Sequence, residues 1–403
     1  MNALVLEGRL IEDGGSIRVT VRSGLVTELD RIEGSGAAEG GALADGTAQA
    51  RSAWISAGWM DIQVNGFGGH DPNAADARPE TVADMVRALW RHGVTAVCPT
   101  IITQSEAHIV QALRTIADAC DRDPLLAASV VGIHVEGPHI SREDGPRGAH
   151  PLAHVRPPDV DEYRRWQEAA RGRIRIITLS PEYAEAVAYV RAIVADGVVA
   201  SVGHTGATGE QIRAAVDAGA TWSTHLGNGA HALIPRHPNY IWEQLAEDRL
   251  KAGFILDGHH LPPAVIRSVI RAKGVERSIL VTDAIGVAGL PPGVYTSAVG
   301  GTVELAPSGR LTLQGTPYLA GSATTLPVCV GIAMRHAGVT LRDAIRMVTA
   351  NPSRLLGLGQ GAGHESVRAG MAANLTVFRA GADGAPPLVE RTIVAGSHVY
   401  GPA

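Results

Sequence analysis

From about residue 55 onward, the sequence alternates short apolar runs with amphipathic stretches of helical period. Clear helical patterns cover residues 80–93, 182–197 and 209–220. A strand followed by a helix, repeated eight times, is typical of a (β/α)8 or TIM barrel, and continuous apolar runs suit strands buried on both faces. The sequence therefore predicts an α/β protein built on a TIM barrel. The expected strands lie near 59–64, 94–98, 130–135, 174–179, 198–203, 221–225, 251–256 and 278–282.

Both ends of the chain have strand character instead. Apolar residues and turn glycines punctuate residues 2–30, and residues 374–380 and 392–401 also fit strands. We therefore predict a small β-sandwich domain formed by both termini. The expected limits are 1–54 and 366–403 for the parts of this domain and 55–365 for the barrel.

Three further segments carry local predictions. Residues 33–50 are rich in Gly and Ala and are expected to be a loose surface loop. A hairpin-like insertion is expected around 294–315, after the eighth strand. Helical patterns resume at 323–337 and 340–350.

Composition excludes several classes of protein. The net charge is −5 and there is no strong basic cluster, which argues against nucleic-acid or anionic-membrane partners. The three cysteines, Cys98, Cys120 and Cys329, are odd in number and lack CxxC spacing, so a disulfide framework is not expected. Neither a signal-peptide pattern nor an 18-residue apolar stretch occurs, and we expect a cytoplasmic protein.

Polar residues stand at the ends of the predicted strands, where barrel active sites gather. Glu136, His204 and His225 offer one carboxylate and two imidazoles, which suit zinc and leave one coordination position open, as in a catalytic site. Asp283, at the end of the eighth strand, is placed to transfer a proton. Taken singly, each histidine could be a hydrogen-bonded structural residue, and Glu136 or Asp283 could cap a helix. Their joint placement in one barrel favours a metal site.

A set of short motifs gives the chain a family resemblance from about residue 55 to 355. On these motifs it resembles the N-acetylglucosamine-6-phosphate deacetylases of the amidohydrolase superfamily. No single motif is specific, but the combination is. The motifs are HVEGP (134–138), RGAHP (147–151), GHT (203–205), THLGN (224–228), DGHH (257–260), VTDA (281–284), GSATTL (321–326) and TANPS (349–353).

The resemblance implies a role for each matching residue. Glu136, His204 and His225 would be the metal ligands, Asp283 the catalytic acid and base, and His150 the group that polarises the acyl carbonyl. Arg236 would bind the 6-phosphate across the interface of a homodimer. The full set of implied substrate contacts is Ala149, Asn228, Gly229, Arg236, His260, Leu319, Ala320 and Gly321.

The first strand bears on the number of metal ions. Many superfamily members carry His-x-His there and bind a second ion, whereas this chain has Gln63 and Asn65. Neutral amides are poor ligands for zinc. We therefore expect one divalent ion per subunit, with Zn²⁺ favoured and Fe²⁺, Co²⁺ or Mn²⁺ compatible with the same ligands.

Departures from the family pattern surround the substrate rather than the metal. Gly206 and Gly227 replace an asparagine and an aromatic residue, His231 is new, the sequence around Arg236 is unusual, and the loop after Glu136 is two residues longer. The expected reaction is hydrolysis of N-acetylglucosamine 6-phosphate. The alternative is a mononuclear amidohydrolase for another N-acyl amino sugar, unphosphorylated or with another acyl group, an N-acyl amino acid or a deaminase-type ring. A non-catalytic scaffold would be expected to lose metal ligands, and this chain keeps them.

Overall fold

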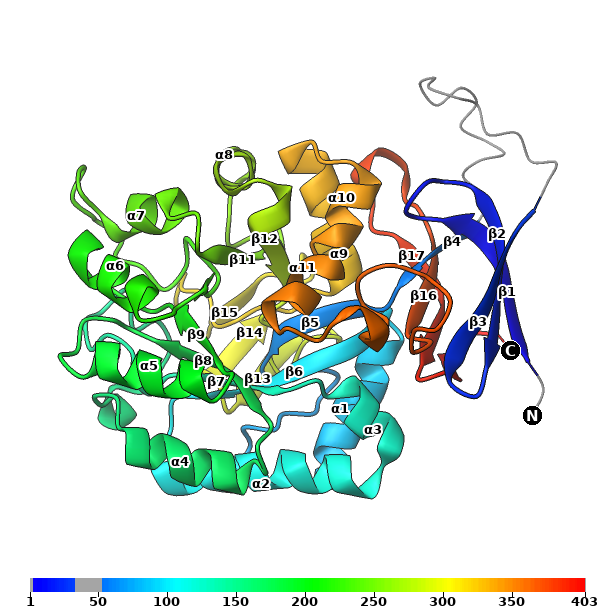
Figure 1. Ribbon diagram of the computed structural model, residues 1–403. Helices are drawn as coiled ribbons and strands as arrows, with labels where there is room; N and C mark the ends of the chain where they lie inside the picture. Colours follow the sequence, from blue (N-terminus) through cyan, green and yellow to red (C-terminus); the bar gives the residue numbers. More distant parts are fainter. Residues whose placement is uncertain (1–2, 33–52, 403) are drawn as a thin grey trace.

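Eight parallel strands form a nearly closed barrel in the computed structural model, which describes residues 3–32 and 53–402 (Figure 1). The expected loop at 33–50 lies outside the described residues. The last and first strands meet where the Asp283 N–H donates to the carbonyl oxygen of Gln63 at 2.9 Å. The TIM-barrel prediction is confirmed. The barrel strands are β5 (Trp59–Val64), β6 (Val94–Ile102), β7 (Ile133–Glu136), β8 (Ile174–Leu179), β9 (Val199–Val202), β10 (Trp222–Ser223), β11 (Lys251–Ile255) and β12 (Ser278–Val281).

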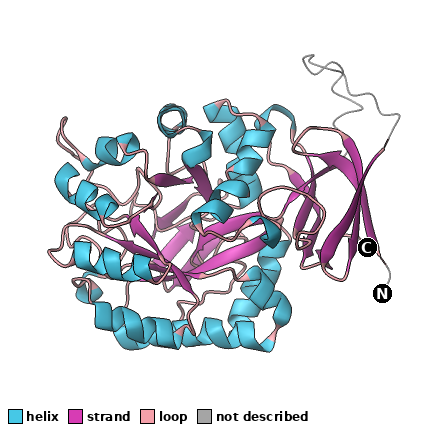
Figure 2. Ribbon diagram, viewed as in Figure 1, coloured by secondary structure: helices cyan, strands magenta, loops and turns pink. Residues whose placement is uncertain are grey.

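Helices surround the barrel strands on the outside (Figure 2). Each presents an apolar stripe inward: in the first helix the buried Val82, Val86 and Leu89 recur at helical spacing. Side-chain caps define several starts, as where the Thr208 hydroxyl accepts the N–H of Gln211. The helices are α1 (Pro79–Trp90), α2 (Glu106–Arg122), α3 (Pro124–Ser129), α4 (Val160–Ala169), α5 (Ala186–Ala195), α6 (Gly209–Asp217), α7 (Tyr240–Ala246), α8 (Pro263–Lys273), α9 (Leu326–Ile332), α10 (Leu341–Arg346) and α11 (Ala350–Leu355), with shorter turns η2 (Leu152–His154), η3 (Val275–Arg277), η4 (Ala333–Ala337), η5 (Gln360–Ala362) and η6 (Ala382–Gly384).

The helix predicted over 340–350 is interrupted. The carbonyl oxygens of Met347 and Val348 turn away from a helical path and accept the N–H groups of Leu280 and Met60, at 3.1 and 2.7 Å. These donors belong to β12 and β5, the last and first strands of the barrel. The break between α10 and α11 therefore provides hydrogen-bond acceptors for both strands where the barrel closes. A tertiary demand of this kind overrides local helical period.

The small β domain predicted from both termini is a single seven-stranded sheet (Figure 1). The turn at Gly24 precedes one edge strand of this sheet, and the turn at Gly396 precedes the other. The two turns are nevertheless in contact. The sheet therefore curls over its own apolar core in the manner of a sandwich. Its strands, in spatial order, are β18 (Ser397–Tyr400), β17 (Leu388–Val394), β16 (Leu375–Arg379), β4 (Trp54–Ala57), β1 (Leu4–Leu10), β2 (Ser16–Arg22) and β3 (Leu25–Arg31); β4 thus extends past residue 54, the predicted limit of the N-terminal part.

The insertion predicted around 294–315 is a three-stranded antiparallel sheet of β13 (Gly293–Ser297), β14 (Gly301–Leu305) and β15 (Leu311–Leu313). Its buried Val303 and Leu311 share an apolar cluster with Ile102 and Ile285, from the carboxyl ends of the barrel strands. The insertion therefore lies over the end of the barrel where polar residues gather. None of the helices in the described ranges combines the length and apolarity needed to cross a membrane.

Candidate metal centre and active-site pocket

The ends of four barrel strands bring the predicted metal and proton-transfer residues together. Glu136 is the last residue of β7, while His204, His225 and Asp283 each follow the ends of β9, β10 and β12 closely. These last three have left-handed backbone conformations, with φ of 49°, 28° and 50°. Such conformations are uncommon outside glycine and gather at functional sites. The strained turns direct the side chains inward over the barrel.

The three predicted ligand atoms converge in a buried cluster. The Glu136 Oε1 atom lies 3.1 Å from His204 Nε2 and 3.0 Å from His225 Nε2, and the two ring nitrogens are 3.0 Å apart. Within the described residues, no other set of three or more His, Cys, Asp or Glu side chains has its ligand atoms so close together. The His204 Nδ1–H donates to the Pro146 carbonyl oxygen at 2.8 Å, which leaves the Nε2 lone pair facing the cluster. This donor set fits a divalent metal ion.

The first-strand amides bond to carboxylates at the same place. Gln63 Nε2 donates to Glu136 Oε1 at 2.9 Å, and Asn65 Nδ2 donates to Asp283 Oδ1 at 2.7 Å. Burial and the negative charge of Glu136 raise the pKa of Asp283. The hydrogen bond from Asn65 acts in the opposite direction and lowers this pKa. The two first-strand amides therefore direct N–H donors, and not lone pairs, toward these carboxylates.

His150 stands beside this cluster as a neutral imidazole. Its ring contacts that of His204, with centroids 4.4 Å apart. Burial and the neighbouring His204 lower the pKa of His150 to about 3, so the ring is uncharged at neutral pH. Its Nδ1 atom lies 2.8 Å from the Thr103 hydroxyl. When Thr103 donates to Nδ1, the ring proton is on Nε2, where it can be donated to a ligand. No motif pointed to Thr103, which lies just after β6.

We expect Thr103→Val to lower kcat with little change in KM, because the isosteric side chain no longer fixes the tautomer of His150. Loss of one hydrogen bond costs roughly 0.5–1.5 kcal/mol, so the expected decrease is about twofold to thirteenfold. Steady-state kinetics with N-acetylglucosamine 6-phosphate, the substrate that the family resemblance implies, measures the effect. Thr103→Ser keeps the hydroxyl and is the matched control, which should retain near wild-type kcat. Equal kinetics for all three proteins would remove Thr103 from this role.

A pocket of about 370 Å³ opens above the cluster and unites most of the residues singled out from the sequence. It also contains residues that no motif indicated, among them Ile102, Val299, Arg310 and Tyr318. These come from the end of β6 and from the three-stranded insertion. The predicted site residues that line it are Asn65, Glu136, Ala149, His150, His204, His225, Asn228, Gly229, His260, Asp283, Leu319 and Gly321.

Three of the predicted residues do not line this pocket. Gln63 lies behind Glu136, to which it bonds. Ala320 is buried in the apolar cluster beneath the insertion. Arg236 lies in the exposed segment 232–238 and does not reach the pocket of its own chain.

His260 and Gly229 are each held by a specific contact. The His260 Nδ1 atom lies 2.7 Å from Asp257 Oδ2. Burial tends to raise the pKa of Asp257, but the contact with His260 outweighs it, and the pKa is lowered. Gly229 has a φ of +56°, and a Cβ atom there would lie 2.8 Å from His204 Nδ1. Glycine is therefore required for the backbone to pack against the ring of His204.

Three departures from the family pattern meet at the rim of the pocket. His231 Nε2 lies 2.7 Å from a carboxylate oxygen of Glu143, in the lengthened loop, and its Nδ1 lies 3.1 Å from the Tyr240 hydroxyl. A Cβ atom on Gly206 would lie 3.0 Å from His231 Cε1. Gly206 thus makes room for His231, which joins the loop before His150 to the loop after His225.

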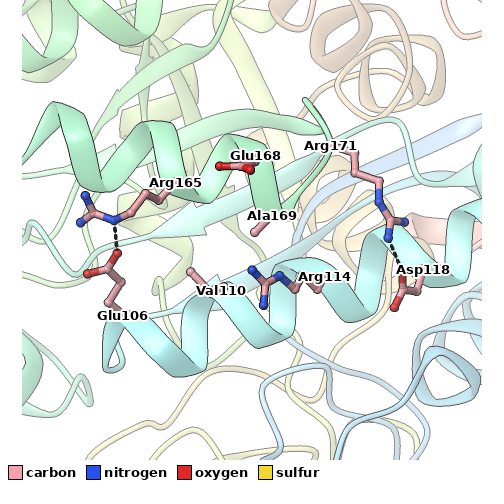
Figure 3. A pocket seen from close by; sticks show the side chains of 8 residues that line it. All are labelled: Glu106, Val110, Arg114, Asp118, Arg165, Glu168, Ala169 and Arg171. Atoms are coloured by element: carbon pink, nitrogen blue, oxygen red, sulfur yellow. Dashed lines mark hydrogen bonds and ion pairs between the residues drawn. The ribbon is translucent and has the colours of Figure 1, made fainter.

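A second depression lies outside the barrel, between α2 and α4 (Figure 3). Two ion pairs span it, Arg165 with Glu106 and Arg171 with Asp118. Ion pairs this exposed contribute little to stability, and the lining contains no histidine, cysteine or hydroxyl group. This depression therefore supplies no imidazole, thiol or hydroxyl group for catalysis.

Comparisons with known proteins agree with this geometry. The amidohydrolase family matches residues 54–399. The N-acetylglucosamine-6-phosphate deacetylase of Homo sapiens is 36% identical over 323 residues, 77% of this chain and 76% of the relative. The N-acetylgalactosamine-6-phosphate deacetylase of Shewanella sp. (strain ANA-3) is 34% identical over 309 residues, 76% of this chain and 75% of the relative. A variant of the N-acetyl-D-glucosamine-6-phosphate deacetylase of Mycobacterium smegmatis, solved with N-acetyl-D-glucosamine-6-phosphate, superposes with a TM-score of 0.83 and 30% identity, covering 99% of this chain and 100% of that one.

Proposed function

The chain belongs to the amidohydrolase family, among the N-acetylglucosamine-6-phosphate deacetylases, and is a hydrolase of amide C–N bonds; we propose that it cleaves N-acetylglucosamine 6-phosphate to glucosamine 6-phosphate and acetate. The observation that carries this proposal is the convergence of Glu136, His204 and His225 beside Asp283 in one pocket. This arrangement supports hydrolysis at a metal centre rather than binding alone.

The side chains divide the work of amide hydrolysis between them. Glu136, His204 and His225 would hold one divalent cation, which supplies Lewis-acid activation of the carbonyl group and of water. His150, neutral and held by Thr103, donates its N–H to the acyl oxygen. Asp283, oriented by Asn65, takes a proton from the attacking water and delivers it to the leaving sugar nitrogen. Asn228, Gly229 and His260 line the same pocket, where they would position the sugar.

Release of acetate from defined substrates tests the proposal. The purified protein, loaded with Zn²⁺, should release acetate from N-acetylglucosamine 6-phosphate with a kcat/KM well above that for free N-acetylglucosamine. No acetate from any N-acyl amino sugar would refute the proposed function. Preference for the free sugar would instead favour the unphosphorylated alternative.

A second candidate substrate is the C4 epimer, N-acetylgalactosamine 6-phosphate. The relative from Shewanella, named for that sugar, is almost as similar as the human one named for the gluco isomer. Both substrates carry the same acetamide and phosphate, so the same ligands and Asp283 would serve either. The ratio of kcat/KM for the two epimers decides between them.

We further propose Zn²⁺ as the ion, a cytoplasmic location and a homodimer. The three cysteines are free and buried, which suits a reducing compartment. Leu233 is 92% exposed and Trp242 is 56% exposed, on the segment that carries Arg236 and the helix that follows it. Apolar side chains this exposed favour burial against a second subunit. Arg236 could then serve the pocket of the partner.

We expect Arg236→Ala to damage turnover of the 6-phosphate substrate far more than turnover of the free sugar. A guanidinium binds phosphate through charge-assisted hydrogen bonds, and one such bond contributes roughly 1.5–3 kcal/mol. The expected loss is therefore about one to two orders of magnitude in kcat/KM for the phosphorylated sugar. Kinetics with both sugars measures it. An equal decrease for both would mean that Arg236 does not contact the phosphate.

A further inference from the structure

Arg310 brings a permanent positive charge to the pocket from an unexpected element. It lies in the turn between β14 and β15, in the insertion that covers the carboxyl ends of the barrel strands. Of the described residues that line the pocket, it is the single lysine or arginine. Glu136 and Asp283, in contrast, come from the barrel itself. The carboxylates of the pocket lining therefore come from the ends of barrel strands, and its guanidinium comes from the insertion.

The turn holds Arg310 in place without neutralising it. Its Nη2 atom donates to the Pro317 carbonyl oxygen at 3.0 Å, and its own carbonyl oxygen accepts the Ala306 N–H at 2.9 Å. Over the described part of the chain, its guanidinium forms no ion pair with a carboxylate. A guanidinium has five N–H donors, and the contact with Pro317 uses one nitrogen. The remaining donors and the full charge are available to an anion.

We propose that Arg310 binds the anionic group of the substrate from within the same chain. This inference rests on the proposed function, since an N-acyl sugar phosphate carries its amide and its dianion at different ends. With the amide at Glu136, His204 and His225, Arg310 is the lysine or arginine of the described pocket lining that can meet the phosphate. A guanidinium there offers two parallel N–H donors to phosphate oxygens. Arg310 then lies in the chain's own pocket, whereas Arg236 lies on the exposed surface of the chain.

The experiment compares Arg310→Ala and Arg310→Lys with the wild-type enzyme, each loaded with metal, on phosphorylated and free N-acetylglucosamine. Arg310→Ala should raise KM for the phosphorylated sugar by about one to two orders of magnitude, as expected for a charge-assisted hydrogen bond. KM for the free sugar should change less than about twofold, within the range of an exposed substitution. Arg310→Lys keeps the charge without the fork and should fall between the two.

Two controls separate a specific effect from a general one. Arg22→Ala, at an exposed end of β2 in the small domain, should leave all constants unchanged. Thermal unfolding and metal content of Arg310→Ala should match those of the wild-type protein, because the side chain is exposed. Equal changes for both sugars, or none for either, would overturn the proposal.

Failure of the proposed function gives a distinct result. If the wild-type protein cleaves no N-acyl amino sugar, the proposed reaction is wrong, but binding of inorganic phosphate can still be measured by calorimetry. The proposal expects phosphate to bind the wild-type protein at least tenfold more tightly than Arg310→Ala. Equal binding by both proteins would overturn it independently of catalysis.

Discussion

Asp283→Asn should reduce kcat by two or more orders of magnitude while the protein keeps its fold and its metal. The amide has nearly the shape of the carboxylate but cannot accept a proton from water and return it to the leaving nitrogen. General acid–base catalysis typically contributes about 10²–10⁴-fold, which sets the size of the effect. Steady-state kinetics on the deacetylation substrate measures kcat, and elemental analysis of the same sample measures the metal.

The surroundings of Asp283 explain why the variant should fold. Its Oδ1 atom accepts N–H groups from Asn65 at 2.7 Å and from Gln63 at 3.3 Å. An asparagine at 283 can keep its side-chain oxygen toward both of these N–H groups, so that neither donor is left unpaired. The melting temperature should stay close to that of the wild-type protein.

Two outcomes would assign Asp283 another role. Near-normal turnover of Asp283→Asn would remove it from proton transfer. Loss of metal together with activity would make it a ligand rather than a proton carrier. Asp30→Asn, an exposed carboxylate change in the small domain, is the control that should alter neither quantity.

The barrel could be predicted because its signal is local. Most strands are predominantly apolar runs, as in β6, where all nine residues are buried, and most runs are followed by a helix of clear period. The break at Met347 and Val348 could not be predicted, because their carbonyl oxygens bond to strands far away in sequence. The curl of the terminal sheet depends likewise on a contact between Gly24 and Gly396 that no local pattern encodes.

The metal cluster could be predicted from the sequence, whereas the part of the pocket lining that contains Arg310 could not. Glu136, His204 and His225 stand at strand ends, and parallel strands bring their ends to one edge, so their meeting follows from the fold. Arg310 lies on an insertion, and a hairpin prediction does not say which way the hairpin folds. The departures at Gly206 and His231 were visible separately, but only the structure joins them, through the contact of His231 with Glu143.

Metal analysis of the purified protein should find close to one divalent ion per chain, and His204→Ala or His225→Ala should lose both the ion and the activity. Each change removes one of three buried donors. Substitution of outer-shell partners already costs roughly 10–100-fold in metal affinity or activity, so loss of a direct ligand should exceed that range. His336→Ala, a histidine in η4 outside the pocket, is the matched control and should keep both.

The number of ions tests the first strand separately from the ligands. Gln63 and Asn65 give N–H groups to Glu136 and Asp283, and an N–H directed at a carboxylate oxygen occupies the side from which a second cation would approach. A titration with Zn²⁺ should therefore saturate at one tight site in the wild-type protein. Replacing both residues by histidine supplies the ligands that two-metal relatives carry and should raise the number of ions toward two. Two tightly held ions in the unaltered protein would show that these amides do not exclude the second metal.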